Sequence, residues 1–278
     1  MQDVTHVEST TKDLHIGSQR LRVMVGQGGA GRPLLLINGI GATGQLFRPF
    51  TQHLADRESI AFDAPGVGGS PAPFYPPTIR RLAGVVAGLV HDLGHQQVDV
   101  LGLSWGGTLA QELAHRHPDV VRRLVLAATM SGWTSLPGRP LAVATLMSPL
   151  RYYSPAYLER VAPTLYGGAI RKHPQLLHEH AQIRASHPPT LIGYTQQLAA
   201  LRRWTSFCWL PRLTQRTLVL AGDDDPIVPL ANARLLANRI PHSHLQIIHN
   251  GGHLFVFTHA QEIAAAVREF LDAEQVAP

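Results

Sequence analysis

The chain has little of several features that would point to particular protein classes. Its 278 residues include one cysteine, Cys208, which excludes an intrachain disulfide and favours a reducing compartment. No stretch approaches the roughly 18 uninterrupted apolar residues of a transmembrane helix, and residues 1–8 have neither the basic start nor the apolar run of a secretory signal. A cytoplasmic protein without a transmembrane segment is therefore expected.

Positive charge is present but scattered. Lys and Arg number 24 against 19 Asp and Glu, which gives a formal charge of +5. The basic residues form no stripe interleaved with aromatic residues, so nucleic-acid binding is not predicted. The length and the hydrophobic fraction of 45% suit one large domain that carries an inserted lobe. The oligomeric state is left open.

Short apolar runs alternate with segments of helical periodicity. After a predicted hairpin around Gly17, the runs stand at residues 34–37, 59–62, 98–101, 124–127, 217–222 and 245–248. A helix is expected from Thr78 to a C-terminal cap at Gly94, and a capping box of Thr258 and Gln261 is expected to open the last helix. Unbroken apolar strands between helices predict an α/β fold whose mostly parallel sheet is covered on both faces.

This alternation stops between Gly132 and about Pro211. The segment is rich in Pro, Tyr, Leu and Met, and helices are expected near residues 155–160 and 191–203. We expect residues 133–211 to form a lid over the carboxyl ends of the strands, where open α/β sheets bind ligands, and residues 1–132 and 212–278 to form the core domain. Two interpretations of the aromatic residues of the lid stay open, the lining of an acyl tunnel and ordinary packing (Trp133, Tyr152, Tyr153, Tyr157 and Tyr166).

The most informative motif is Gly-Leu-Ser-Trp-Gly at residues 102–106. An apolar strand precedes it, and Leu109 and Leu113 follow it at helical spacing. A serine on so sharp a turn between strand and helix projects its hydroxyl from the backbone, and flanking glycines let the chain pass without clashes. The helix N-terminus also favours developing negative charge. Ser104 is therefore the candidate nucleophile.

A nucleophilic serine needs a base, and the base needs an orienting carboxylate. Both types occur downstream in the order Ser, Asp, His, each in a loop that follows a predicted strand. Asp223, Asp224 and Asp225 are the candidate acids. His253 is the candidate base, because its rival His249 abuts the strand and has no preceding glycine.

Backbone amides are expected to form an oxyanion hole. One belongs to Trp105, directly after the nucleophile, and the other to the loop after the first buried strand, at Ile40. Asn38 either braces that loop through hydrogen bonds or is a turn former.

Other patterns have simpler explanations than a binding site. Residues 66–69 are glycine-rich, but two prolines and no helix follow them, so a plain turn is expected rather than a phosphate loop. Cys208, between Phe207 and Trp209, is expected to be a buried filler. Four histidines lack acidic or thiol partners at fixed spacing and are expected to be solvated side chains of the lid rather than metal ligands (His173, His178, His180 and His187).

Taken together, these motifs resemble the α/β-hydrolases, and more narrowly the intracellular depolymerases of medium-chain-length poly(3-hydroxyalkanoates). The narrower resemblance is carried by Asn-Gly-Ile-Gly-Ala at 38–42 and Ala-Pro-Thr-Leu-Tyr-Gly-Gly at 162–168, and it spans nearly the whole chain. The family pattern Gly-x-x-Asp-x-x-x-Pro matches Gly222, Asp225 and Pro229, so the resemblance selects Asp225 as the acid.

The resemblance implies a serine hydrolase that cuts polyester bonds at a granule surface and releases 3-hydroxy acids, with no metal or organic cofactor. The alternative is a carboxylesterase or lactonase that acts on small soluble esters with the same triad. A catalytically dead scaffold would normally lack a triad member, and Ser104, Asp225 and His253 are all present.

Overall fold

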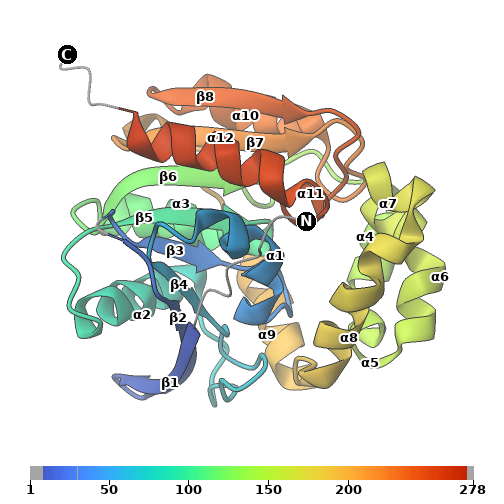
Figure 1. Ribbon diagram of the computed structural model, residues 1–278, viewed down its shortest axis with the longest axis horizontal. Coiled ribbons are helices and arrows are strands. Elements are labelled where there is room, and N and C mark those ends of the chain that lie inside the picture. Colours follow the sequence, from blue (N-terminus) through green and yellow to red (C-terminus); the bar gives the residue numbers. More distant parts are fainter. Residues whose placement is uncertain (1–8, 30, 274–278) are drawn as a thin grey trace.

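The computed structural model describes residues 9–29 and 31–273. Its centre is an eight-stranded sheet in the order β1-β2-β4-β3-β5-β6-β7-β8 (Figure 1). β2 is antiparallel to both of its neighbours, and every other pair is parallel. The strands are β1 (Ser9–Ile16), β2 (Gln19–Gly26), β3 (Leu34–Ile37), β4 (Ser59–Phe62), β5 (Val98–Leu103), β6 (Val121–Ala127), β7 (Arg216–Gly222) and β8 (Ser243–Ile248).

Helices cover both faces of this sheet, as the apolar runs predict. α2 (Ile79–Asp92), α3 (Trp105–Arg116) and α10 (Leu230–Arg239) share one core with Leu35 and Ile37 of β3. α1 (Arg48–Thr51), α11 (Phe255–Thr258) and α12 (Ala260–Asp272) share the opposite core with Leu34 and Leu36. Because side chains alternate along a strand, a strand buried on both faces needs an unbroken apolar sequence. The predicted α/β class is confirmed.

The segment between β6 and β7 is mostly helical. It contains α4 (Pro140–Leu146), α5 (Leu150–Tyr153), α6 (Pro155–Tyr166), α7 (Gly168–Lys172), α8 (His178–Ser186) and α9 (Leu191–Arg202). Short 3-10 turns lie at η1 (Gly44–Phe47), η2 (Gln52–Leu54), η3 (Pro174–Leu177) and η4 (Leu210–Arg212). The two helices expected from the sequence are present as α6 and α9. Figure 1 shows α4 to α8 beyond the carboxyl ends of the strands, to the right of the sheet.

The two ends of this helical segment meet at one place. Gly132 and Thr205 form a β-bridge. The Ser206 amide donates to the Ser131 carbonyl at 2.9 Å, and the Trp133 amide donates to the Trp204 carbonyl at 3.2 Å. Because its ends are tied together, the segment leaves the sheet and returns to it at a single point.

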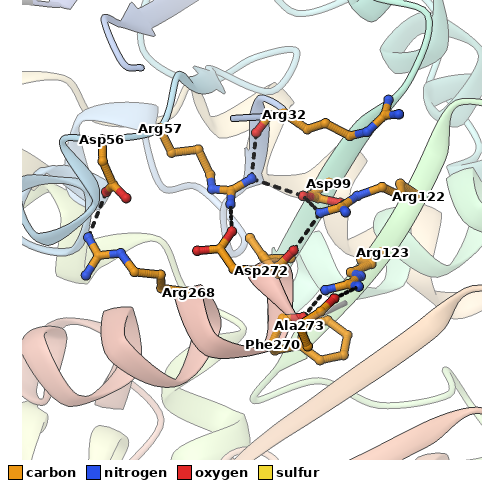
Figure 2. A network of polar contacts seen from close by, with 11 residues as sticks. Arg32, Asp56, Arg57, Asp99, Arg122, Arg123, Arg268, Phe270, Asp272 and Ala273 are labelled. Carbon is orange, nitrogen blue, oxygen red and sulfur yellow. Dashed lines mark hydrogen bonds and ion pairs between the residues drawn. The ribbon is translucent and has the colours of Figure 1, made fainter. Parts of the chain in front are cut away.

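A buried ionic network closes the opposite end of the sheet (Figure 2). Asp99, at the start of β5, is fully buried and accepts two hydrogen bonds from Arg122, at 2.7 and 2.6 Å. Arg57 donates to Asp99 at 3.3 Å and also pairs with Asp272 at the end of α12. The Arg122 guanidinium reaches the Leu271 carbonyl at 2.8 Å. The network therefore joins β5, β6 and the end of α12.

Two local predictions are wrong. Thr258 does not open the last helix, because it is the final residue of α11 and its hydroxyl donates to the carbonyl of Leu254 instead. Cys208 is exposed. Its neighbours place their rings against the protein, Trp209 stacked on His115 and Phe207 under Arg239, so the side chain between them points outward.

Candidate active site

Ser104 lies on a strained turn between β5 and α3. Its backbone has φ 55° and ψ −117°, a conformation that side-chain-bearing residues rarely adopt and that tends to cluster at functional sites. A Cβ at Gly106 would lie 2.0 Å from the Ile37 carbonyl oxygen, and one at Gly102 would lie 2.6 Å from the Ala110 Cβ. The two glycines of the motif are therefore required by close packing, and the half-buried serine projects from the turn.

The structure brings His253 and Asp225 to this serine. The Nε2 atom of His253 lies 3.0 Å from the Ser104 Oγ, and its Nδ1 atom lies 2.8 Å from the Asp225 Oδ2. The other carboxylate oxygen of Asp225 accepts the amides of Ile227 and Val228, at 2.8 and 2.9 Å. The His253 and Asp225 side chains are 6% and 1% exposed, so water competes little for either group.

The rival acids and the rival base are occupied elsewhere. Asp223 faces His249 at 2.9 Å, and that histidine is 98% exposed. Asp224 pairs with Arg139 and Arg171 and accepts the Gly168 amide at 2.9 Å. Of the three adjacent carboxylates, Asp225 is the one that contacts His253.

The glycines before His253 serve close packing. A Cβ at Gly252 would lie 2.1 Å from the Tyr166 carbonyl oxygen, and one at Gly222 would lie 2.1 Å from the Gly251 carbonyl oxygen. The His253 amide donates to the same Tyr166 carbonyl at 2.7 Å. The end of α6 therefore holds the histidine loop in place.

The loop after β3 lies beside the serine. A Cβ at Gly39 would be 3.5 Å from the Ser104 Cβ and 3.9 Å from its Oγ. Asn38 braces this loop, because its Nδ2 donates to the Thr43 carbonyl and its Oδ1 accepts the Gly39 amide, both at 2.8 Å. In the described ranges, neither the Ile40 amide nor the Trp105 amide has a hydrogen-bond acceptor in the protein.

Of two further expectations from the sequence, one agrees with the structure and one is wrong. The turn at residues 66–69 is a plain turn, closed by a hydrogen bond from the Gly66 amide to the Ser70 carbonyl at 3.0 Å. The expectation that all four lid histidines are solvated is wrong for His180, which is 4% exposed and packs its ring 4.4 Å from that of Phe257. Ala181 and Arg184 of α8, and Leu177 directly before it, are buried with His180, and their helical spacing is the signal that could have revealed it.

Contacts that the sequence did not reveal connect the helical segment to the loop after β3. The Tyr152 hydroxyl donates to the Ile40 carbonyl, and Gln197 of α9 accepts the Gly41 amide at 2.8 Å. The guanidinium groups of Arg151 and Arg184 lie 4.7 and 4.9 Å from the centroid of the Tyr152 ring. These partners are more than 100 residues apart from the loop, so no local pattern could indicate them.

The fold, the strained serine and its histidine and aspartate define a class of protein. A model of the alpha/beta hydrolase family matches residues 34–266, and the chain belongs to that family. The poly(3-hydroxyalkanoate) depolymerase of Ectopseudomonas oleovorans is 47% identical over 245 residues, which cover 87% of this chain and 85% of that protein. The predicted resemblance to this group of hydrolases is confirmed.

Solved structures agree with this assignment. A hydrolase from Pseudomonas aeruginosa PA01 has a TM-score of 0.79 and 26% identity, with 95% of this chain and 98% of that chain covered. A thermophilic esterase from Thermogutta terrifontis has a TM-score of 0.77 and 25% identity, with the same coverage. Within the described residues, no helix is both long and apolar enough to span a membrane.

Proposed function

We propose that this protein is a serine hydrolase that cleaves the ester bonds of medium-chain-length poly(3-hydroxyalkanoate) and releases 3-hydroxy acids. The observation that carries the proposal is the continuous contact from Ser104 through His253 to Asp225, at 3.0 and 2.8 Å. The choice of this polyester as the substrate rests on the relative that is 47% identical and is named a poly(3-hydroxyalkanoate) depolymerase. Hydrolysis of a carboxylic ester is the reaction that this family and this arrangement of side chains support.

The proposed mechanism uses the three side chains and two backbone amides. Ser104 Oγ attacks the ester carbonyl while His253 Nε2 takes its proton, and Asp225 holds the imidazole in the tautomer that leaves Nε2 free. The amides of Ile40 and Trp105 stabilise the oxyanion of the tetrahedral intermediate. His253 then protonates the leaving alcohol. In the second half-reaction His253 activates water, which releases the acid from the acyl-serine. These steps use side chains and backbone amides alone.

We propose further that residues 133–211 act as a lid and that their surface docks onto the polyester. All but three of the large hydrophobic side chains exposed among the described residues belong to this segment (Trp133, Leu136, Leu141, Met147, Leu150, Tyr153, Leu176, Leu191 and Ile192). Phe74 and Tyr75 adjoin the segment, since the carbonyl of the preceding Pro73 accepts a hydrogen bond from Gln196 of α9 at 3.0 Å. Exposed apolar side chains gathered on one segment favour adsorption to an apolar surface such as a polymer granule in the cytoplasm.

The substrate is tested with purified protein on a panel of esters. We expect a medium-chain polyester to be degraded in preference to poly(3-hydroxybutyrate), and p-nitrophenyl esters to be cleaved best near eight carbons, because each buried methylene contributes about 0.8 kcal/mol. Preference for acetate esters or a soluble lactone, with no attack on polymer, would replace the depolymerase by the carboxylesterase or lactonase alternative. The solved esterase with 25% identity keeps that alternative relevant.

Docking is tested separately from catalysis by sedimentation with polyester granules. Ser104→Ala should pellet with granules as the wild type does, because docking does not require the nucleophile. Ile192→Asp should reduce the pelleted fraction, since Ile192 is 64% exposed on α9. The matched control is Ile247→Asp, which introduces the same charge at a 44% exposed position on β8. Equal losses for the two variants would argue against a docking surface on the lid.

A further inference from the structure

One peptide unit beside Ser104 is held at both ends by the helical segment. The Ile40 carbonyl accepts a hydrogen bond from the Tyr152 hydroxyl of α5, and the Gly41 amide donates to Gln197 Oε1 of α9 at 2.8 Å. These two groups belong to the same peptide bond. Fixing its plane restricts ψ of Ile40 and φ of Gly41, and this limits the directions that the neighbouring Ile40 N–H can take.

Gln197 also contacts the side chain of Trp105, the residue whose backbone amide is the second proposed oxyanion donor. Its backbone carbonyl accepts a hydrogen bond from the Trp105 indole Nε1 at 3.1 Å. Trp105 is the first residue of α3, where the backbone N–H has no acceptor within the helix. Gln197 is 4% exposed, so both of its hydrogen bonds are shielded from water. A single residue of α9 therefore contacts the two chain segments that supply the proposed oxyanion donors.

We propose that Gln197, together with Tyr152, is a positioning residue that aligns the oxyanion hole. This inference rests on the proposed function. Neither side chain hydrogen-bonds Ser104 or His253, so both act through Ile40, Gly41 and Trp105. Asn38 braces the loop from within, and the helical segment adds a second support at Gly41, which has φ +70° and packs directly against the rings of Tyr152 and Tyr194.

The Tyr152 side chain is itself held in a stack of charges and rings. Arg151 lies between Tyr152 and Tyr194, at 4.7 and 5.4 Å from their centroids. Arg184 lies between Tyr152 and Tyr166, at 4.9 and 5.5 Å. Cation–π contacts shielded from water are stronger than exposed ones. The stack joins α5, α6, α8 and α9, so its assembly places the Tyr152 hydroxyl on the Ile40 carbonyl.

The decisive variant is Gln197→Met, which keeps the side-chain length and removes the acceptor for the Gly41 amide. Loss of an oxyanion donor costs about 10²- to 10³-fold in kcat, and a misaligned donor should cost less, about 10- to 50-fold. KM for p-nitrophenyl octanoate should stay within about twofold, because the donors act mainly on the transition state. The Ki of an alkyl trifluoromethyl ketone, whose hemiketal oxyanion occupies the hole, should rise by the same factor as kcat/KM falls.

Gln196→Met is the matched control. Gln196 precedes Gln197 in α9, is 7% exposed and donates to the Pro73 carbonyl at 3.0 Å. The Gln196→Met variant loses a comparable hydrogen bond away from the oxyanion loop. Its kcat should therefore stay within about twofold of the wild-type value, while its Tm should shift about as much as that of Gln197→Met. Equal kcat losses in the two variants would show that Gln197 is merely structural and would overturn the inference.

Tyr152→Phe gives a second test if Gln197→Met does not fold, because it removes a single hydroxyl. It should lower kcat with little change in KM, and a wild-type kcat in this variant overturns the inference. Labelling by a fluorophosphonate distinguishes failure of the proposed function from failure of this inference alone. A wild-type protein that is not labelled at Ser104 refutes the proposed function and this inference with it. A labelled wild type with unchanged kcat in Gln197→Met refutes this inference alone.

Discussion

The Asp225 Oδ2 lies 2.8 Å from the Nδ1 of His253, whereas the preceding residue, Asp224, points toward Arg139 and Arg171. The separation arises because the second oxygen of Asp225 caps the amides of Ile227 and Val228, which fixes its carboxylate plane. Neighbouring residues of identical chemistry thus have different surroundings. This difference allows the acid to be identified by substitution.

Asp225→Asn should lower kcat by about 10⁴-fold, because the amide no longer stabilises the imidazolium or selects the required tautomer. The kcat values of Asp223→Asn and Asp224→Asn should each stay within about threefold of the wild-type value. The two carboxylates pair with exposed or half-exposed side chains, and such ion pairs contribute little energy. Steady-state kinetics on p-nitrophenyl octanoate checks all three. A severe effect of Asp224→Asn would mean that a different carboxylate orients the histidine.

Ser104→Ala should reduce turnover by about 10⁴-fold or more and leave the fold intact. Substitution by alanine removes the hydroxyl but keeps the Cβ, so the strained backbone at φ 55° meets the same steric cost. Mass spectrometry after treatment with a fluorophosphonate should find the label on Ser104 in the wild type and no label in the variant. Labelling of another serine would contradict the assignment.

Exhaustive treatment with EDTA should leave activity unchanged. The proposed steps use the Ser104 hydroxyl, the His253 imidazole and two backbone N–H groups, and none requires a Lewis acid. The measurement is initial rate before and after chelation, with added Zn²⁺, Mn²⁺ and Ca²⁺ as separate arms. Lost activity that a divalent metal restores would show that the mechanism is incomplete.

Asp99→Asn should destabilise the protein without impairing catalysis. Removing the charge of the buried Asp99 leaves Arg122 without its ion-pair partner and leaves Arg57 with Asp272 alone, at a cost of about 3–5 kcal/mol in unfolding free energy. Asp99 lies five positions before Ser104, about 16 Å along the strand, so kcat of the folded fraction should be unchanged. Urea denaturation gives the unfolding free energy.

The matched control for Asp99 is Asp13→Asn, which breaks the exposed pair with Arg20 on the β1–β2 hairpin. Exposed pairs contribute about 0–1 kcal/mol, so this variant should unfold close to the wild type. Similar effects of the two substitutions would show that burial of Asp99 does not determine the stability of the network.

His180 should make the protein sensitive to acid. Burial lowers the pKa of His180 well below its ordinary value, and the charge of Arg184 lowers it further. The unfolded chain therefore binds a proton below about pH 6.5 that the folded protein does not bind, and stability falls with pH by about 1.4 kcal/mol per unit for this group. Stability is fully present above that pH and is lost as the pH falls.

The test compares the wild type with His180→Leu by urea denaturation at pH 7 and pH 5. The wild type should lose about 2 kcal/mol more than the variant between these values, because the variant lacks the titrating group. Parallel losses in the two proteins would mean that His180 is protonated in the folded state.

The sequence predicts most of the sheet and the candidate triad because their signals are local. A strand buried on both faces must be apolar at every position, and a turn as tight as that of Ser104 needs glycine at 102 and 106. The order of serine, acid and histidine also follows from the chain, since each comes directly after a strand. The acid among residues 223–225 needed the family resemblance in addition.

Local patterns failed where the outcome depended on packing partners far away in the chain. Cys208 has apolar neighbours in sequence, yet these neighbours fill the space and leave it exposed. His180 lies in a polar stretch, yet the fold of the helical segment buries it. The direction of each side chain was decided when the elements packed, and composition does not record that direction.

By itself the sequence determined the α/β class and pointed to the turn of the candidate nucleophile and to the candidate base. Only the tertiary structure decided how Tyr152 and Gln197 meet the loop at residues 38–42, across 112 and 156 residues of chain. The physical reason is that a hydrogen bond has a strict geometry, whereas the residue types that make it are common. A glutamine in a helix gives no local signal of its hydrogen-bond partners. The two contacts of Gln197 exist only because α9 packs against the carboxyl edge of the sheet.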